Sequence, residues 1–463
     1  MGHLRRDPWT REFADYADGF SDCWGEAPSE TKWVRKKNTQ EAGKGYPRAL
    51  LLPGGRKSMA PMAHRLGVNA NVLQQFVTDS PWDDEAVLRT NIRIMKRRMS
   101  GPQGVLLLDD TSILKRGEKS VGVTHQYSGQ VGGAAHCQAT VSCLYVLPGM
   151  QKNRDALSWP VGMQLYLPKD WAKDKARRKV AKVPKNVRFL TKDQIGLRLI
   201  DRAVEEEVPF RAVVTDGGYG SNGPLRAELR RRRLPYVVGV GTTKVKSVAE
   251  GTPLALPAGG PPRKFVRQFA SYPRDVEART PLDWSRVLPP TEWHRIAWTE
   301  GSKGLLEGGF ARIRVRVVHR RRGRRATDET GWLLLERQGD ELKAFLAWGL
   351  DGLSLKDLVR LAHTRWAIEQ SYQQMKNELG LDHFEGRTWR GWHHHATLVM
   401  LAYSFLMLLR AKGNMAEEDV PTLPEVRRRL IETVSMWILR KELGITERRA
   451  KKALQALPWI LDE

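Results

Sequence analysis

The hydrophobic pattern of the first hundred residues is helical. Residues 58–77 place apolar side chains at near-helical spacing on both sides of a Gly-Val-Asn break. A second helical pattern covers residues 83–99 and ends in a basic run. Helix-break-helix patterns occur in helix-turn-helix units and also in plain helical packing, and this pattern leaves both interpretations open. We therefore expect a mainly helical region over residues 1–101.

After residue 102 the pattern changes to short apolar runs rich in β-branched side chains, which predict strands. Three runs follow one another, as in an antiparallel meander, and two more each come after a helix. A basic, polar segment at residues 168–184 is expected to be an exposed excursion. Successive strands followed by strand-helix-strand predict a mixed α/β sheet covered by helices. The expected strands are 105–110, 120–127, 137–147, 210–216 and 235–240, with helices at 193–207 and 224–233.

Residues 241–352 are rich in proline and glycine and contain short alternating segments, which predict a β-rich insertion. In one segment Arg312, Arg314 and Arg316 alternate with aliphatic side chains, as in a half-buried strand with one basic face. Residues 320–325 are expected to form a loop or hairpin turn. Tryptophans in the insertion are expected to form its small core, with stacking on unpaired bases as the alternative. They are Trp284, Trp293, Trp298, Trp332 and Trp348.

Helical patterns return at residues 354–379, 392–410 and 423–457. A chain of 463 residues is long enough for several structural units. The expected units are the helical region 1–101, a first part of the α/β core over 102–240, the insertion 241–352, a second part of the core over 353–415, and C-terminal helices over 416–463.

The charge balance favours a polyanionic partner. The chain has 77 Lys and Arg against 52 Asp and Glu, a net charge of +25, so nucleic acid is the leading candidate and the helical region 1–101 is assigned to DNA binding. No basic amphipathic helix indicates membrane binding. Three cysteines without a CxxC pair argue against a disulfide framework or a cysteine zinc site. Because neither a signal peptide nor an apolar membrane span is found, we expect a cytoplasmic protein associated with the nucleoid.

Acidic residues stand where strands end. Asp109 and Asp110 end one apolar run, and Asp216 ends another and is followed by glycines. Since side chains alternate along a strand, only one of the first two faces a shared site easily. A third acid, Glu369, shares one stripe of a later helix with Arg365, Tyr372 and Lys376. Each acid alone is weak evidence, because strand-end aspartates often form turns and helical glutamates often form ion pairs.

Together, three carboxylates suit metal-dependent phosphodiester cleavage. They can hold two Mg²⁺ ions about 3.5–4 Å apart, which activate an oxygen nucleophile and stabilise the leaving oxygen. Without a cation, gathered carboxylates would repel one another. The acids therefore predict a divalent metal site.

Three stretches of the sequence resemble a known family. LLLDDTSILKRGEKSVGVTHQYSGQVG, VVTDGGYGSN and RWAIEQSYQQMKNELG resemble DDE transposases of the insertion sequence 701 family, which is related to the insertion sequence 4 group. The likeness extends into the N-terminal region through GRKSMAPMAHRLG and FVTDSPWDDEAVLR. It implies a ribonuclease-H-like core, with two Mg²⁺, or Mn²⁺ in their place, held by the catalytic residues Asp110, Asp216 and Glu369.

The resemblance also implies roles for neighbouring residues. Asp110 is preferred over Asp109 because relatives have Asp followed by Thr, and Asp110 precedes Thr111. Relatives often have a tyrosine three residues before the signature arginine, and Ala362 occupies that position here. Contacts with DNA are expected from the helix residues Arg365, Tyr372 and Lys376, and from the basic turn residues Lys115, Arg116 and Lys119, for which a solvated turn is the alternative.

The implied activity is cut-and-paste transposition. Metal-activated water cleaves double-stranded DNA at the ends of an element, and the freed 3′-hydroxyl attacks target DNA. Joining two ends implies a homodimer, and accessory proteins are a further expected class of partner. The 153 residues between Asp216 and Glu369 (369 − 216) agree with the β-strand insertion of relatives that cut through a DNA hairpin, without deciding whether a hairpin forms here. The alternatives are a DNA-binding regulator without catalysis and a nuclease that cuts without joining.

Other sequence features compete less well. The adjacent residues His393, His394 and His395 would fan around a helix, so they are expected in packing or phosphate contact rather than on one metal. The segment GGYG after Asp216 lacks the glycine spacing of nucleotide-binding loops. Ser128 lacks the GxSxG context of a serine nucleophile.

Overall fold

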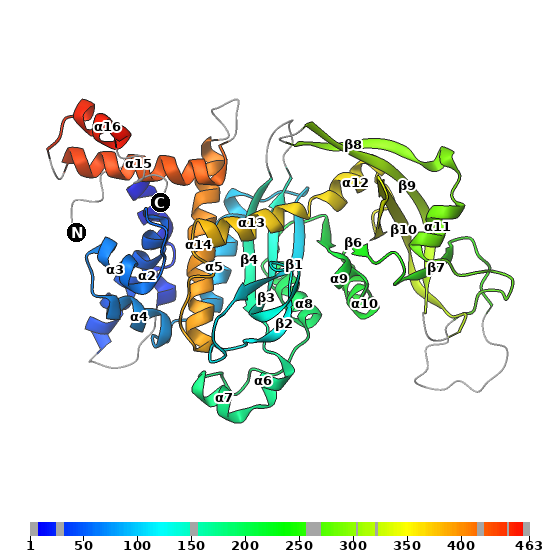
Figure 1. Ribbon diagram of the computed structural model, residues 1–463, viewed down its shortest axis with the longest axis horizontal. Coiled ribbons are helices and arrows are strands. Elements are labelled where there is room, and N and C mark those ends of the chain that lie inside the picture. The colour runs from blue at the N-terminus through cyan, green and yellow to red at the C-terminus, as the bar shows by residue number, and fades with distance from the viewer. Residues whose placement is uncertain are drawn as a thin grey trace.

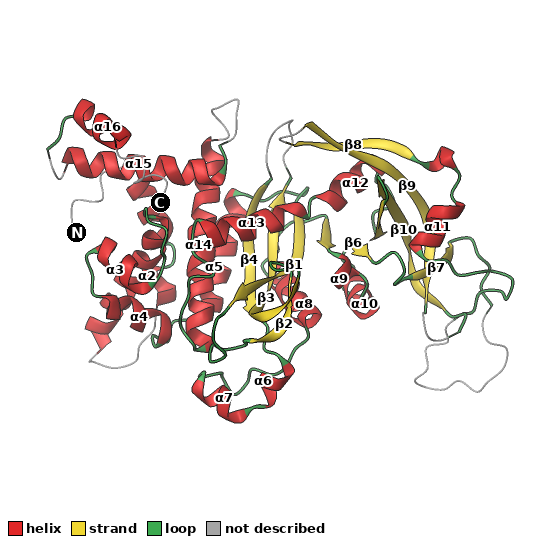
Figure 2. Ribbon diagram, in the orientation of Figure 1, coloured by secondary structure: helices red, strands yellow, loops and turns green. Residues whose placement is uncertain are grey.

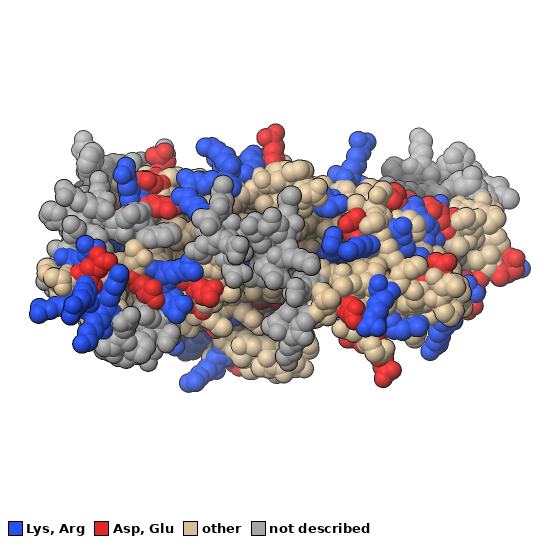
Figure 3. All heavy atoms as spheres, turned by 90° about the horizontal axis from the view of Figure 1, so that it is seen from above, with Lys and Arg blue, Asp and Glu red and all other residues tan. Residues whose placement is uncertain are grey.

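The computed structural model describes residues 8–24, 32–148, 156–255, 270–301, 304–319, 323–413, 421–441 and 444–456. The molecule is elongated, with helices at one end, a sheet in the centre and a β-rich part at the other end (Figures 1 and 2). Seen from above, Lys and Arg are interspersed with Asp and Glu among the described residues (Figure 3). The charge surplus is therefore not gathered on that face.

The N-terminal region is helical, as its hydrophobic pattern predicts. Its inner faces are apolar and pack on one another and on the long C-terminal helix α14 (Trp389–Gly413). The remaining helices are α1 (Pro8–Asp18), the 3₁₀ helix η2 (Ser21–Trp24), α2 (Lys32–Leu51), α3 (Met59–Leu66), α4 (Ala70–Thr78) and α5 (Asp84–Arg98).

The central sheet has the strand order expected of a ribonuclease-H-like core. Its neighbours run β4-β3-β1-β5-β6, with β3 antiparallel to β1 and β4, and with β1, β5 and β6 mutually parallel. The predicted fold class is confirmed. The strands are β1 (Val105–Leu114), β2 (Thr124–Ser128), β3 (Gly133–Leu147), β4 (Leu157–Leu165), β5 (Ala212–Thr215) and β6 (Tyr236–Val240).

Three strands differ from the expectation. The strand expected at 105–110 is β1, which continues to Leu114 because residues 111–114 also pair with β3, so Asp109 and Asp110 lie within the strand and not at its end. The strand expected at 120–127 is β2, which begins only at Thr124 because the preceding residues form a turn around Gly122, whose φ is +76°. Strand β4 was not predicted. It contains Pro160 and Gly162, which weaken the strand pattern, yet it lies between β3 and α14 and is almost wholly buried.

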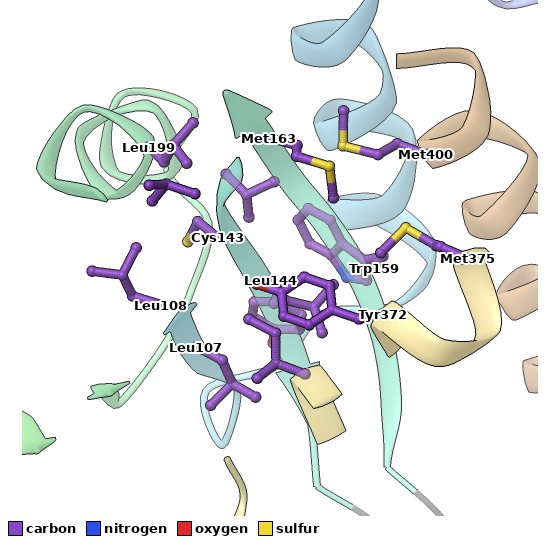
Figure 4. Close-up of a cluster of buried hydrophobic side chains, with 14 of the residues drawn as sticks. Leu107, Leu108, Cys143, Leu144, Trp159, Met163, Leu199, Tyr372, Met375 and Met400 are labelled. Atoms are coloured by element: carbon purple, nitrogen blue, oxygen red, sulfur yellow. The ribbon is translucent and has the colours of Figure 1, made fainter. Parts of the chain in front are cut away.

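Helices cover both faces of this sheet. On one face Leu108 and Cys143 point towards Leu199 of α8, and on the other face Tyr372 and Met375 pack near Trp159 (Figure 4). The core-flanking helices are α8 (Lys192–Glu205), α9 (Gly217–Gly220), α10 (Gly223–Arg231), α12 (Leu355–His363), α13 (Trp366–Asn377) and α14. The basic excursion forms two short helices, α6 (Lys169–Lys173) and α7 (Lys175–Val180).

The β-rich insertion extends the central sheet instead of forming a separate one. Strand β11 pairs antiparallel with β6, so the insertion strands continue an eleven-stranded sheet among the described residues. Its tryptophans and arginines contact one another: Arg312 and Arg314 lie over Trp332, and Arg337 lies over Trp293. The elements are β7 (Lys246–Ala249), α11 (Pro281–Val287), η3 (Pro290–Glu292), β8 (His294–Gly301), β9 (Gly304–Val318), β10 (Ala326–Gln338) and β11 (Glu341–Trp348).

The C-terminal part is helical, but the helix expected at 354–379 is two helices. α12 ends at His363 and α13 begins at Trp366, with Arg365 as its N-terminal cap residue. The chain then continues through α14 to α15 (Leu423–Lys441) and α16 (Glu447–Ala456). Of the helices in the described ranges, none is both long and apolar enough to cross a bilayer. The expected turn at 320–325 lies partly outside the described residues.

Candidate active site

Strand β1 presents its two adjacent aspartates to different helices. Asp109 is opposite Ser142 in the β1–β3 register, and the Ser142 hydroxyl is hydrogen-bonded to the hydroxyl of Tyr372 on α13. Asp110 faces the other side, where its Oδ2 accepts a hydrogen bond of 2.6 Å from Lys192 Nζ on α8. The alternation of side chains along a strand therefore directs Asp109 to the helix that carries Glu369, and Asp110 away from it.

Arg365 joins two of the acids. Its Nη1 lies 2.9 Å from Asp109 Oδ2, and its Nη2 donates to Glu369 Oε1 one helical turn further along α13. The charge of Asp216 acts on both Asp109 and Arg365. Arg365 thus contacts the carboxylates of Asp109 and Glu369, with the negative charge of Asp216 acting on the same site, and we call these four residues the acidic centre.

Asp216 is held where strand β5 meets helix α9. It is the N-cap of α9, and its Oδ1 accepts a hydrogen bond of 3.0 Å from the backbone nitrogen of Tyr219. The glycines beside it permit this tight turn: a Cβ at Gly220 would lie 2.0 Å from the carbonyl oxygen of Gly239. Any side chain there would push α9 off strand β6 and shift Asp216 with it.

The surroundings of Asp109 in the acidic centre disfavour its charged form. Asp109 is only 8% exposed, and burial together with the negative charge of Asp216 raises its pKa to about 7, although Arg365 opposes the shift. Burial lowers the pKa of Arg365, but the neighbouring carboxylates of Asp109, Glu369 and Asp216 outweigh this and raise it. Like charges are held together here against their mutual repulsion.

The donor chemistry of the acidic centre suits a hard divalent cation, because carboxylate oxygens are the ligands that Mg²⁺ prefers. The side-chain arrangement is not a ready-made metal site, however. Among the residues that the structure describes, no three His, Cys, Asp or Glu side chains lie close enough together to hold a metal ion. The guanidinium of Arg365 is the cation that the carboxylates of Asp109 and Glu369 contact in this arrangement.

The remaining predicted contact residues have varied surroundings. Lys376 Nζ donates to Thr111 Oγ1 at 3.0 Å and to the carbonyl oxygen of Ser112 at 2.9 Å, so it lies beside the end of β1. Tyr372 is buried, and its hydroxyl is hydrogen-bonded to Ser142. Lys115 Nζ donates to the carbonyl of Phe384 at 2.7 Å. Arg116 and Lys119 are exposed.

Sequence reasoning missed the charged groups that surround Asp110. Lys192 and Asp193 begin helix α8, and the pKa of Asp193 is raised by burial and by the charges of Asp110 and Asp216. The local signal was only a helix start, since Thr191 and Gln194 form a capping box. That α8 begins beside β1 is a long-range contact which no local pattern encodes.

Two features connect the centre to its surroundings. Trp366, the first residue of α13, is 47% exposed beside Arg365. Two residues before Arg365, the ring of His363 stacks on Trp298 of the insertion at 3.9 Å, and its Nε2 lies 3.2 Å from the buried carboxylate of Glu336 on β10. The insertion therefore holds the end of α12, two residues before Arg365.

The three adjacent histidines serve packing, one of their expected roles. His393 Nδ1 is 2.9 Å from the carbonyl oxygen of Trp389, and His394 stacks on Trp82 at 3.7 Å. His395 Nδ1 is 2.9 Å from the Tyr46 hydroxyl, and its Nε2 is 3.0 Å from the carbonyl oxygen of Gly380. Burial lowers the pKa of His395 to about 4.

Comparisons with known proteins identify the family of the chain. A family model described as "DDE superfamily endonuclease" matches residues 31–305 of the chain. The match includes Asp109, Asp110 and Asp216 and ends before Glu369.

One similar protein is described as a "probable transposase for insertion sequence element IS701" from Microchaete diplosiphon. It is 25% identical over 187 residues, which cover 40% of this chain and 44% of the relative, so the match spans less than half of the relative's length. The resemblance to the insertion sequence 701 family is thereby confirmed at the level of sequence similarity.

One solved structure is also similar, a piggyBac transposase synaptic complex with hairpin DNA. The alignment covers 98% of this chain and 83% of that chain, with 10% identity and a TM-score of 0.36. The ribonuclease-H-like fold is identified by the strand order of the central sheet, which is independent of this alignment.

Proposed function

Because this chain belongs to the DDE superfamily of endonucleases, we propose that it is a transposase that cuts double-stranded DNA at the ends of a mobile element and joins the freed 3′-hydroxyl to target DNA. One observation carries the proposal. Asp109 in β1 and Glu369 on α13 both contact Arg365, and the charge of Asp216 at the end of β5 acts on Asp109 and Arg365, although more than a hundred residues separate each of these acids from the next.

The carboxylates of the acidic centre are the proposed ligands of Mg²⁺, or of Mn²⁺ in its place. A divalent metal would supply a water of lowered pKa and positive charge at the reacting phosphate. The cations of the chain have a separate role: Arg365 and Lys376 lie on the same helix and are proposed to hold phosphate oxygens beside the scissile bond. For Arg365, this requires its guanidinium to exchange carboxylate contacts for phosphate contacts.

The first acid is assigned to Asp109 on the basis of its contacts. Asp109 faces Glu369 through Arg365, whereas Asp110 is paired with Lys192 on the opposite face of the sheet. The sequence resemblance favours Asp110 because it precedes Thr111. The two assignments predict opposite activities for the Asp109→Asn and Asp110→Asn variants.

Strand transfer and pairing of two copies follow from the proposed reaction rather than from a contact in the chain. Joining two element ends to one target requires two active sites, so a homodimer is the proposed active form. Support for joining comes from the similarity to the probable IS701 transposase.

The test is to incubate the purified full-length chain with DNA flanking its own gene, with Mg²⁺ and with EDTA. Glu369→Ala is compared with Glu341→Ala, in which an exposed glutamate of the insertion is removed instead. We expect Mg²⁺-dependent cuts at defined ends and joined products, lost in Glu369→Ala and kept in Glu341→Ala. Binding without cuts would favour a regulator, cuts without joined products would favour a nuclease, and an active Glu369→Ala protein would refute the assignment.

A further inference from the structure

Helices α3 and α4 form a helix-turn-helix unit. Gly67 ends α3 in the left-handed conformation, with φ of +65°, and Asn69 caps α4 by accepting a hydrogen bond of 2.9 Å from the backbone nitrogen of Asn71. The two helices are thus separated by a turn of three residues. Their inner faces are apolar, with Met62 of α3 and Phe76 of α4 buried. The break that the sequence pattern left open is therefore a tight turn between two packed helices.

The outer face of α4 is polar but uncharged. Asn71, Gln74 and Gln75 are exposed, and their side-chain amides make no hydrogen bond within the described part of the chain. Val72 adds a side chain that is 39% exposed to the same helix. Asn and Gln amides form paired hydrogen bonds with adenine in the major groove, and an aliphatic group fits the thymine methyl. A helix surface meant only for solvation would more often carry charges.

The basic excursion supplies the charge that α4 lacks. Residues 168–190 contain nine Lys and Arg against two Asp. Arg177 lies over the Trp171 ring at 3.9 Å, which braces α7 on α6. The lysines of this segment, in contrast, are exposed, although Lys182 also forms an ion pair. They are Lys169, Lys173, Lys175, Lys179, Lys182 and Lys185.

Direct contacts bring the two features together at the end of α4. Asp79, the C-cap of α4, pairs with Lys182 just after α7 at 3.0 Å, and its carbonyl oxygen accepts from Arg390 Nη1 at 3.3 Å. A backbone hydrogen bond of 2.8 Å from Trp389 to Ala181 fixes the excursion to the start of α14. In Figure 1, α4 and the α6–α7 pair both lie along the lower edge of the molecule.

We propose that this α4–α7 surface is where the protein recognises the sequence of its DNA substrate. Helix α4 lies in the major groove with Asn71, Gln74 and Gln75 on base edges, and the lysines of residues 173–185 hold the flanking phosphates. The surface is made of residues separate from the acidic centre. The inference rests on the proposed function, since it takes double-stranded DNA as the substrate, and it assigns sequence recognition to α4.

The test separates recognition from phosphate binding. The full-length wild type first selects duplexes from a random pool, and fluorescence anisotropy then measures binding to a selected and a scrambled duplex at several salt concentrations. One variant replaces the three amide residues of α4 (Asn71→Ala, Gln74→Ala and Gln75→Ala). A second variant neutralises lysines that form no ion pair in the described chain (Lys175→Gln, Lys179→Gln and Lys185→Gln).

We expect the amide variant to bind the scrambled duplex within about twofold of the wild type but to lose about 10-fold or more of its preference for the selected duplex. The lysine variant should bind both duplexes more weakly, and its log–log salt slope should be smaller by roughly 0.9 for each phosphate that it no longer neutralises. Controls are Gln338→Ala and Lys343→Gln on the insertion, which should leave both quantities unchanged. Circular dichroism confirms that each variant is folded.

Two results would overturn the inference: an amide variant that keeps the full preference, or a lysine variant with the wild-type salt slope. Mg²⁺-dependent nicking of plasmid DNA, measured in parallel, distinguishes this inference from the proposed function. Sequence preference that disappears with the α4 amides in a protein that never nicks DNA would support the α4–α7 surface and count against the nuclease. Mg²⁺-dependent nicking together with an amide variant that keeps its sequence preference would support the nuclease and count against the α4–α7 surface.

Discussion

The acidic centre, which includes Glu369 of α13, and the histidines of the contacting helix α14 are two groups of titratable side chains. The two groups differ in how their polar atoms are paired. Each ring nitrogen of His393, His394 and His395 has a polar neighbour within hydrogen-bonding distance. In the acidic centre, the carboxylates of Asp109 and Glu369 share one guanidinium, and the pKa of Asp109 is raised to about 7 by burial and by the charge of Asp216.

The difference shows how function can be recognised in a buried polar cluster. A satisfied neutral group such as His395 stabilises the fold and needs no other explanation. Like charges kept together at a cost are retained for another reason, and catalysis is the usual one. The sequence drew attention to both groups, three adjacent histidines and three separated acids, and the contacts tell them apart.

The largest effect should come from replacing the aspartates of β1 by asparagine, one in each of two variants. Asp109→Asn should reduce cleavage at least about 100-fold, the loss seen when one preorganised charged or polar group leaves an active site. Asp110→Asn should keep more activity, because its carboxylate pairs with Lys192 on the other face of the sheet. Initial rates of DNA cutting in Mg²⁺, with DNA binding measured separately, decide between them. If Asp110→Asn is the inactive variant, the motif predicts the first acid better than the contacts do.

A smaller effect is expected on stability when a satisfied histidine is replaced. His395→Gln should destabilise the protein by about 1–3 kcal/mol at pH 7, because the Tyr46 hydroxyl and the Gly380 carbonyl lose a matched partner. Cleavage rates of the folded variant should stay close to those of the wild type. Urea unfolding monitored by tryptophan fluorescence measures the change. A variant as stable as the wild type would contradict the packing role.

The same variant should also change the pH dependence. The folded pKa of His395 is lowered to about 4 from an ordinary value of 6.5, so only the unfolded state binds its proton between these values. This contribution to stability is complete above pH 6.5 and is lost as the pH falls towards 4. At pH 5 the wild type should have lost about 2 kcal/mol through this group, and the destabilisation by His395→Gln should shrink accordingly.

The smallest effect concerns the acidic centre without metal. The folded pKa of Asp109 is raised, so the folded state keeps its proton up to about pH 7 while the unfolded state releases it near the ordinary value for Asp. Asp109 therefore costs stability increasingly as the pH rises to 7. In EDTA, the stability of Asp109→Asn relative to the wild type should increase by about 1–2 kcal/mol between pH 6 and pH 8. Thermal unfolding measures this change. A stability difference between Asp109→Asn and the wild type that stays constant with pH would contradict the raised pKa of Asp109, and with it the contrast between the acidic centre and His395.

Local patterns were sufficient for much of the fold. Hydrophobic spacing of 3.6 residues located α3, α4 and α5, and runs of β-branched residues located β1, β3, β5 and β6. The position of Asp216 at the end of a strand was also evident, as was the stripe from Arg365 to Lys376, whereas Asp109 and Asp110 lie within β1 and not at its end. These features depend on residues close in sequence, and nothing distant is needed to produce them.

Other features were decided only by contacts between distant segments. The strand β4, with Pro160 and Gly162, exists because β3 and α14 bury it, and the insertion joins the core sheet because β11 pairs with β6. Alternation along β1 indicated that its two aspartates face apart, but only the packing of α13 on one face and α8 on the other determined which one meets Glu369. Hydrophobic periodicity is a property of a single segment, whereas strand pairing and the face that a side chain shares with another element depend on the free energy of two segments together. The sequence by itself therefore determined most of the elements, and the tertiary structure decided which side chains share a site.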